Sequence, residues 1–160
     1  MNEQVERDVM EYDVLIIGGG PSGLSSAIKV KQLASAEGKD VSVCVLEKGS
    51  EIGAHILSGN VFEPTALNEL IPDWKEKEAP LNSPATKDIV KFMISENFSF
   101  NIPFPSFLIP TFNNHGNYVM SLANFTRWLA TQAESLGVEI FPGFTAAEVI
   151  FEENVVKGVL

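Results

Sequence analysis

Two scarcities, of cysteine and of basic residues, narrow the classes to which this 160-residue sequence can belong. It has one cysteine, Cys44, which can neither form an internal disulfide nor supply the thiolates of an iron–sulfur cluster. It has only 11 Lys and Arg against 21 Asp and Glu, and this acidic balance argues against nucleic acid and against attraction to anionic lipid by charge alone. We therefore expect no disulfide framework and no nucleic-acid partner, and any iron–sulfur centre would lie outside this chain.

The sequence also has no visible targeting or membrane-spanning segment. Residues 1–13 (MNEQVERDVMEYD) are acidic and polar, without the basic start and apolar stretch of a secretory signal. No apolar run reaches the roughly 20 residues that a membrane-spanning helix needs. The apolar fraction of 45% is that of an ordinary globular protein, and 160 residues are enough for one domain with a core. We expect residues 11–160 to form this domain and residues 1–10 to be a tail.

A glycine-rich turn between a strand and a helix is the strongest positive signal. Val14–Ile17 is a short apolar run rich in β-branched residues, which predicts a buried parallel strand. Gly18, Gly20 and Gly23 follow it at the spacing G-x-G-x-x-G. In this motif the first glycine permits a tight turn, the second lets the backbone approach a pyrophosphate, and the third lets the helix pack close to the sheet.

A helix and an acidic residue complete the motif. The helix is expected over residues 22–36, beginning around Pro21 and Ser22, where the free N–H groups and the helix dipole favour a phosphate. The next apolar run, residues 41–46, ends in Glu47, whose carboxylate can accept both hydroxyl hydrogens of an adenosine ribose. The sequence therefore predicts a β-α-β dinucleotide site, although the motif does not distinguish FAD from NAD.

The segment that follows Glu47 is expected to run along the ligand. Residues 48–60 (KGSEIGAHILSGN) contain three glycines and show no clear period, so a flexible surface loop is the alternative. Ser58 and Gly59 are the candidate neighbours of a flat ring system. His55 has no Cys, Asp or Glu paired with it by sequence motif, and we expect a structural or cofactor-edge residue rather than a catalyst.

The middle of the chain changes character. Residues 64–71 predict a short helix that ends before a proline, residues 73–84 a solvent-exposed loop, and residues 88–94 a strand. Residues 97–126 contain no Asp, Glu, Lys or Arg, and three prolines among them forbid a helix and interrupt any central strand. This stretch predicts either an exposed apolar surface for a membrane or partner, or the wall of an apolar pocket.

The last part of the chain predicts a helix over residues 122–136, a strand over 138–141 and a hairpin over 146–160. Arg127 on the helix could approach a pyrophosphate or be solvated. The hairpin is expected to turn at Glu153–Asn154. Because a dinucleotide domain needs further parallel strands, the chain looks incomplete. The apolar face of the helix is expected to comprise Phe125, Trp128, Leu129, Ala133 and Leu136.

Several motifs resemble, in their order, those of a known family. They are GGGPSG, VLEKG, GAHILSGN followed by FEP, NNHGNYV, and the helix and strand that begin at W-L. From about Glu11 onward the chain is similar to the N-terminal part of electron transfer flavoprotein–ubiquinone oxidoreductases. The glycine motif is shared with many flavoproteins, whereas GAHILSGNVFEPTALNELIPDWK and NNHGNY are more specific to this family.

The resemblance implies an α/β fold of the glutathione-reductase type, a Rossmann-like FAD-binding domain of which this chain is the N-terminal part. Enzymes of this family take electrons from reduced electron transfer flavoprotein and pass them to ubiquinone through FAD and a four-iron four-sulfur cluster. The cluster cysteines would lie beyond this chain, and we predict no catalytic acid, base or metal ligand within it. The cofactor-binding residues implied by the motifs are Gly18, Gly20, Pro21, Ser22 and Gly23 for the pyrophosphate, Glu47 for the ribose, Lys48 next to it, and Ser58 and Gly59 near the flavin.

The resemblance also favours the membrane reading of the uncharged stretch. An apolar Phe/Pro-rich hairpin insertion over residues 97–113 would meet the bilayer and the quinone path through Phe98–Phe112. The protein would then be monotopic on the inner (cytoplasmic) membrane of a bacterium, or on the mitochondrial inner membrane after processing. The alternatives are a sibling FAD-dependent reductase of the geranylgeranyl-reductase-like or nitrogen-fixation-associated type, an inactive truncated remnant, and an NAD dehydrogenase that shares the first motif.

Overall fold

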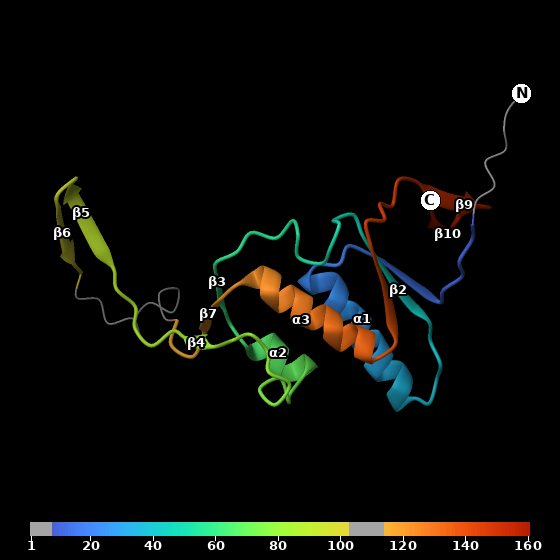
Figure 1. The fold of residues 1–160 in the computed structure, drawn as a ribbon, viewed down its shortest axis with the longest axis horizontal. Helices are drawn as coiled ribbons and strands as arrows, with labels where there is room; N and C mark the ends of the chain where they lie inside the picture. Colours follow the sequence, from blue (N-terminus) through green and yellow to red (C-terminus); the bar gives the residue numbers. More distant parts are fainter. Residues whose placement is uncertain (1–7, 103–113) are drawn as a thin grey trace, which may run out of the picture. The chain divides into compact units, whose positions relative to one another are not determined.

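The computed structural model describes residues 8–102 and 114–160, which divide into two compact units (Figure 1). The first unit comprises the described residues up to His55 together with Thr126–Leu160, and the second comprises those between Ile56 and Phe125. The first unit contains β1 (Val14–Ile17), α1 (Pro21–Ala36), β2 (Val43–Glu47), most of α3 (Leu122–Ser135), β8 (Val138–Pro142), β9 (Val149–Glu152) and β10 (Val155–Val159). The second contains β3 (Asn60–Phe62), α2 (Thr65–Leu70), β4 (Ser83–Pro84), β5 (Lys91–Ser95), β6 (Phe98–Asn101), β7 (Tyr118–Met120) and the first turn of α3.

A parallel three-stranded sheet in the order β1-β2-β8 is the centre of the first unit. The register places Val43 of the central strand β2 opposite Val14 of β1 and opposite Val138 of β8. Val43, Cys44 and Val45 are buried, as expected for a parallel strand covered on both faces. The predicted β-α-β unit is therefore confirmed, and Cys44 is a core residue.

Helix α1 packs on this sheet through a narrower face than the sequence pattern predicts. The pattern of apolar residues in the sequence predicts a face made of Leu24, Ala27, Ile28, Val30 and Leu33. Leu24, Ala27 and Ile28 are fully buried, but Leu33 is 54% exposed. Leu33 lies five residues after Ile28, which places it about 140° round the helix at 3.6 residues per turn. Ala34 continues the buried face instead.

Helix α3 shows the predicted amphipathic spacing. Phe125, Leu129 and Ala133, four residues apart, are all buried. Leu136 was expected to extend this face but is exposed, because the helix ends at Ser135 and Gly137 adopts a φ of +81° that turns the chain away. Among the described residues, no helix is long and apolar enough to cross a membrane.

The second unit contains an antiparallel sheet in the order β3-β7-β4 and corrects one sequence expectation. Residues 73–84 do not form a simple solvent loop, because Trp74 and Leu81 are buried. The indole Nε1 of Trp74 donates to Oδ1 of Asn68 at 2.7 Å, and its ring meets that of Tyr118 edge-on at 5.7 Å. Trp74 is surrounded by polar residues in the sequence, so its burial was not predicted. Its aromatic partner, Tyr118, is distant in sequence.

A separate hairpin in the second unit is formed by β5 and β6 (Figure 1). The strand expected over residues 88–94 begins later, at Lys91, because Asp88 instead accepts hydrogen bonds from the backbone N–H and the side-chain amide of Asn114 at 3.0 and 2.8 Å. The predicted Phe/Pro-rich insertion falls partly on β6. Its remainder, residues 103–113, lies outside the described residues, and the insertion stays a prediction.

The C-terminal hairpin of β9 and β10 turns where the sequence predicted. Glu153 and Asn154 have φ values of +49° and +64°, the left-handed pair that a tight hairpin turn requires. Its strands carry exposed apolar side chains, among them Phe151 and Val156. This two-residue turn was predictable because the positive φ values it requires depend on the two turn residues and not on distant parts of the chain.

Candidate functional site

The glycine motif forms the turn between β1 and α1, and each glycine answers a different demand. Gly18 has a φ of +104°, and its N–H donates to the carbonyl of Leu46 at 2.7 Å. A Cβ on Gly23 would collide with the carbonyl oxygen of Gly18, so only glycine lets α1 approach the turn this closely. A Cβ on Gly20 would meet no described atom within 4 Å, which leaves the backbone there open to a ligand.

The N-terminus of α1 has the features of an anion site. Gly20 is the residue before the helix, with extended backbone, and Pro21 occupies the first turn. Among the described residues, no side chain caps this end of α1 by a hydrogen bond, and its first turn contains no acidic residue. The unpaired N–H groups and the positive end of the helix dipole therefore suit a phosphate. Ser22 in this turn is exposed.

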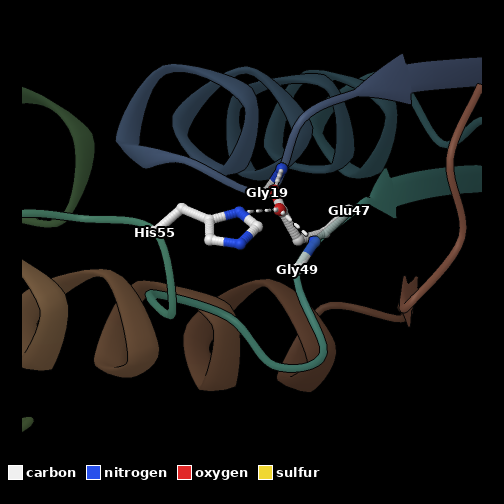
Figure 2. Close-up of polar contacts among 4 residues, drawn as sticks. All are labelled: Gly19, Glu47, Gly49 and His55. Carbon is white, nitrogen blue, oxygen red and sulfur yellow. Dashed lines mark hydrogen bonds and ion pairs between the residues drawn. The ribbon is translucent and has the colours of Figure 1, made fainter.

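Glu47, the last residue of β2, lies at the centre of the site (Figure 2). Its Oε2 accepts the N–H of Gly19 at 2.8 Å, and its Oε1 accepts the N–H of Gly49 at 2.7 Å. The side chain is only 16% exposed. The residue predicted to bind a ribose is therefore held in place by backbone donors from the two loops that follow β1 and β2.

His55 has a partner that the sequence motif did not reveal. Figure 2 shows its imidazole beside the Glu47 carboxylate, with Nδ1 at 4.0 Å from Oε1. The His55 side chain is 60% exposed, so it forms the outer rim of this group rather than its core. Its expected role as a structural or cofactor-edge residue stays a prediction.

Sequence reasoning missed two glycines that contact Glu47. A Cβ on Gly19 would collide with Cδ1 of Ile52 and lie 3.1 Å from Cβ of Glu47. A Cβ on Gly49 would lie 3.0 Å from Oε1 of Glu47. The unbroken Gly18-Gly19-Gly20 triplet was a signal for the first, since the motif needs only the outer two.

The loop after β2 is tied to more distant parts of the first unit. The N–H of Gly143 donates to the carbonyl of Gly49 at 2.7 Å, and the N–H of Phe144 donates to the carbonyl of Glu47 at 3.0 Å. Arg127 of α3 pairs with Glu51 of the loop at 3.2 Å, with both side chains largely solvated. Arg127 therefore matches the solvated alternative, as a surface ion pair.

Three predicted cofactor-binding residues remain: Lys48, Ser58 and Gly59. Lys48, next to Glu47, is exposed. Ser58 and Gly59 belong to the second unit, where the Ser58 hydroxyl donates to that of Ser121 at 3.0 Å and Gly59 has a φ of +93°. Their place near a flavin stays a prediction.

The opposite ends of β1 and β2 carry polar contacts of another kind. The Tyr12 hydroxyl donates to Oε2 of Glu139 at 2.8 Å, and desolvation together with this bond raises the pKa of Tyr12 to about 12. Hydrogen bonds from the backbone N–H and the hydroxyl of Ser42 lower the pKa of Asp13.

Cys44 lies inside β2. Burial raises the pKa of the Cys44 thiol, which therefore stays protonated and inert.

Comparison with known families and structures supports the predicted fold. The family described as "NAD(P)-binding Rossmann-like domain" matches residues 16–72, which contain the glycine turn, α1 and Glu47. A geranylgeranyl bacteriochlorophyll reductase-like protein from Thermoplasma acidophilum is similar in structure, with a TM-score of 0.65 and 24% identity over 92% of this chain and 34% of that one. An aklavinone-11 hydroxylase solved with FAD and aklavinone has a TM-score of 0.62 and 17% identity over 92% of this chain and 28% of that one. The predicted α/β Rossmann-like fold is confirmed.

Curated relatives are closer in sequence. The chain is 56% identical, over 98% of its length, to the electron transfer flavoprotein-ubiquinone oxidoreductase of Pseudomonas aeruginosa, of which it covers 28%. It is 51% identical over 96% of its length to the mitochondrial protein of that name from Oryza sativa subsp. japonica and 49% identical over 97% to that of Mus musculus, covering 26% and 25% of them. The chain thus spans about a quarter of the length of these relatives. The resemblance to their N-terminal part is confirmed.

Proposed function

We propose that this chain is the FAD-binding N-terminal part of an enzyme that takes electrons from reduced electron transfer flavoprotein and passes them to ubiquinone. The observation that carries the proposal is identity of 49–56% over almost the whole chain to relatives that bear this name. The matched region covers 96–98% of the chain and so includes the glycine turn, the loop after β2 and the second unit. A sibling reductase of the same fold is favoured less, because its support is structural similarity at 24% identity.

FAD is the proposed cofactor, and the residues at the glycine turn fit it. The open backbone at Gly20 and the uncapped N-terminus of α1 would receive the pyrophosphate. Glu47 would accept hydroxyl hydrogens of the adenosine ribose, and Ser58 with Gly59 would border the flavin. When bound, FAD supplies the electron-transfer chemistry, while this chain binds and orients it.

The proposed four-iron four-sulfur cluster belongs to the full-length protein only. Within the part of the chain that the structure describes, no group of three or more His, Cys, Asp or Glu side chains could hold a metal ion. Cys44 lies inside the sheet with a protonated thiol and is not a suitable ligand. The cluster would therefore be held by cysteines outside residues 1–160.

The enzyme proposal is tested on the purified full-length protein. We expect a bound flavin with its visible absorbance, bleaching of that absorbance by reduced electron transfer flavoprotein, and recovery on addition of ubiquinone. Bound flavin that is reduced by a nicotinamide nucleotide, and not by electron transfer flavoprotein, would support a different reductase. A protein without flavin would overturn the proposal.

We also propose that the β5–β6 hairpin faces the membrane, at the inner membrane of a bacterium or of a mitochondrion. Phe92 and Phe100 lie opposite each other on the two strands with their rings 5.6 Å apart, and both are exposed. Burying an apolar side chain contributes about 1.5–3 kcal/mol, so several together could hold a protein at a bilayer surface. The exposed apolar side chains of this region are Ile89, Phe92, Met93, Ile94, Phe98 and Phe100.

Liposome flotation tests the membrane proposal. The double variant Phe92→Ser/Phe100→Ser should lose about tenfold or more of its vesicle binding, given the free energy of burying two aromatic rings. The matched control is Phe151→Ser/Val156→Ser, a cross-strand pair that is equally exposed on the β9–β10 hairpin. Equal binding by both double variants and the unmodified protein would contradict the proposal.

A further inference from the structure

We propose that Glu47 shapes the pyrophosphate-binding turn before any nucleotide binds, so that it is a positioning residue for the phosphates as well as a ribose ligand. This inference rests on the dinucleotide site of the proposed function and deepens it. The structural unit, which we call the latch, consists of the Glu47 carboxylate and the N–H groups of Gly19 and Gly49 (Figure 2).

The latch joins the loop after β1 to the loop after β2 and adds to two other contacts there, the hydrogen bond from Gly18 to the carbonyl of Leu46 and the packing of Ile52 beside Gly19. Gly19 follows β1 and lies between the first two glycines of the motif, whereas Gly49 follows β2. One carboxylate accepts from both, at 2.8 and 2.7 Å, while being largely shielded from water. Hydrogen bonds to a carboxylate acceptor are among the stronger ones, so this side chain adds to the Gly18–Leu46 hydrogen bond in holding the glycine turn beside the end of β2.

Gly19 and Gly49 lie so close to Glu47 that little space is left for a side chain on either glycine. Neither Gly19 nor Gly49 could carry a Cβ without displacing atoms of Glu47 or of Ile52. By contrast, a Cβ on Gly20 would meet no described atom within 4 Å. The backbone of Gly19 thus contacts the Glu47 carboxylate, whereas the open space at Gly20, the next residue, can receive a ligand.

The acceptor capacity of the carboxylate leaves room for a ribose. A carboxylate offers about four lone-pair sites, two on each oxygen. The latch uses one site on each oxygen, which leaves one on each for two adjacent hydroxyl donors. A nucleotide with a free 2′,3′-diol can therefore bind without opening the latch, whereas a 2′-phosphate would bring negative charge against it.

Amide hydrogen exchange in the ligand-free protein tests the latch directly. In Glu47→Gln, the amides of Gly19 and Gly49 should exchange on the order of tenfold to a hundredfold faster than in the unmodified protein. The Gly18 amide, which donates to the carbonyl of Leu46, is the internal reference and should not change. The control variant is Glu51→Gln, a carboxylate of the same loop that pairs with Arg127. Unchanged exchange at Gly19 and Gly49 in Glu47→Gln would overturn the proposal.

Should Glu47→Gln fail to fold, the same question is put to Glu47→Asp, which keeps a carboxylate on a side chain one methylene shorter. The shorter side chain should not reach both donors that Glu47 holds at 2.8 and 2.7 Å, so the amides of Gly19 and Gly49 should exchange faster than in the unmodified protein, with Gly18 again as the internal reference. Unchanged exchange at both glycines in Glu47→Asp would overturn the latch.

Nucleotide binding separates the two roles of Glu47. With ADP and 2′,3′-dideoxy-ADP as probes, Glu47→Gln should weaken both, the dideoxy nucleotide by about tenfold through the latch and ADP by more. Unchanged affinity for the dideoxy nucleotide would show that Glu47 acts through the ribose alone and would overturn the inference. If the unmodified protein binds neither ADP nor FAD, the proposed function fails, while the amide exchange still decides whether the latch exists.

Discussion

The two ends of the parallel sheet in the first unit are both braced by a carboxylate, yet the braces differ. At the amino ends of β1 and β2, Asp13 accepts the N–H and the hydroxyl of Ser42 at 2.8 and 2.7 Å, and the Ser42 oxygen accepts the N–H of Asp13. At the carboxyl ends, Glu47 accepts from Gly19 and Gly49. Both braces join neighbouring strand ends, but Asp13 is exposed and Glu47 is partly buried.

This difference distinguishes the hydrogen-bonded pair at the amino ends of the strands from the proposed binding site at their carboxyl ends. The Asp13–Ser42 pair is reciprocal and closed, since each residue satisfies the other. The Glu47 group lies close to Gly20, where a Cβ would meet no described atom within 4 Å, and to the N-terminus of α1, which no described side chain caps by a hydrogen bond. In α/β sheets, ligands bind at the carboxyl ends of the strands, and this chain places its open donors at that end.

The largest effect on this comparison should come from Gly23→Ala. The added Cβ would collide with the carbonyl oxygen of Gly18, a backbone atom that cannot rotate away. We expect a loss of about 3 kcal/mol in the free energy of unfolding, measured by urea denaturation, even though alanine ordinarily gains up to about 1 kcal/mol in a helix.

Gly20→Ala is the matched control for that prediction. Its Cβ would meet no described atom within 4 Å, so the stability should change by about 1 kcal/mol or less. The same variant should still weaken dinucleotide binding, because the methyl group would occupy the open backbone face. Equal stability losses in the two variants would mean that the close approach of α1 to the turn is not specific to Gly23.

A smaller effect is expected from Asp13→Asn at the other end of the sheet. Because Ser42 lowers the pKa of Asp13 in the folded protein, this carboxylate stabilises the fold at pH values above its unfolded pKa of about 3.9. That contribution disappears as the pH falls through the lower, folded pKa. Urea denaturation from neutral to acidic pH should therefore show the variant less stable at pH 7 and equal to the unmodified protein in strong acid. A constant difference at every pH would contradict the pairing.

The smallest effect concerns Tyr12, whose hydroxyl is bonded to Glu139. In a Tyr118→Phe background, Tyr12 is the one remaining tyrosine, and its ultraviolet titration should give a pKa of about 12. Adding Glu139→Gln should move that pKa back toward the ordinary value of about 10, leaving the share caused by desolvation. Since a raised pKa favours the neutral phenol, its contribution to stability is complete below about pH 10 and is lost as the pH rises through about 12. A titration unaffected by Glu139→Gln would contradict the hydrogen bond.

Much of the candidate site was predictable because its signals are local. The strand at Val14–Ile17, the glycine spacing and the acidic residue ending β2 each depend on a few consecutive residues. The hairpin turn at Glu153–Asn154 was predictable for the same reason. A backbone that must turn tightly at a given residue restricts the amino acid there, whatever the rest of the chain does.

Other features could not be predicted, because they depend on residues distant in sequence. The burial of Trp74 depends on Tyr118, and the role of Gly19 depends on Glu47, 28 residues away. The partner of His55 depends on how the loop after β2 folds back. Leu33 is a different kind of miss: it is apolar and was expected on the buried face of α1, but it lies on an exposed part of the helix.

The sequence by itself determined the β-α-β unit, the family resemblance and the residues available to hold a dinucleotide. Only the tertiary structure decided that both oxygens of Glu47 accept backbone N–H groups and that a Cβ on Gly19 or Gly49 would crowd this side chain. The physical reason is the register of the sheet. Pairing β1 with β2 brings the turn after one strand within hydrogen-bonding distance of the last residue of the other, and hydrophobic period or residue spacing along the chain does not encode that distance.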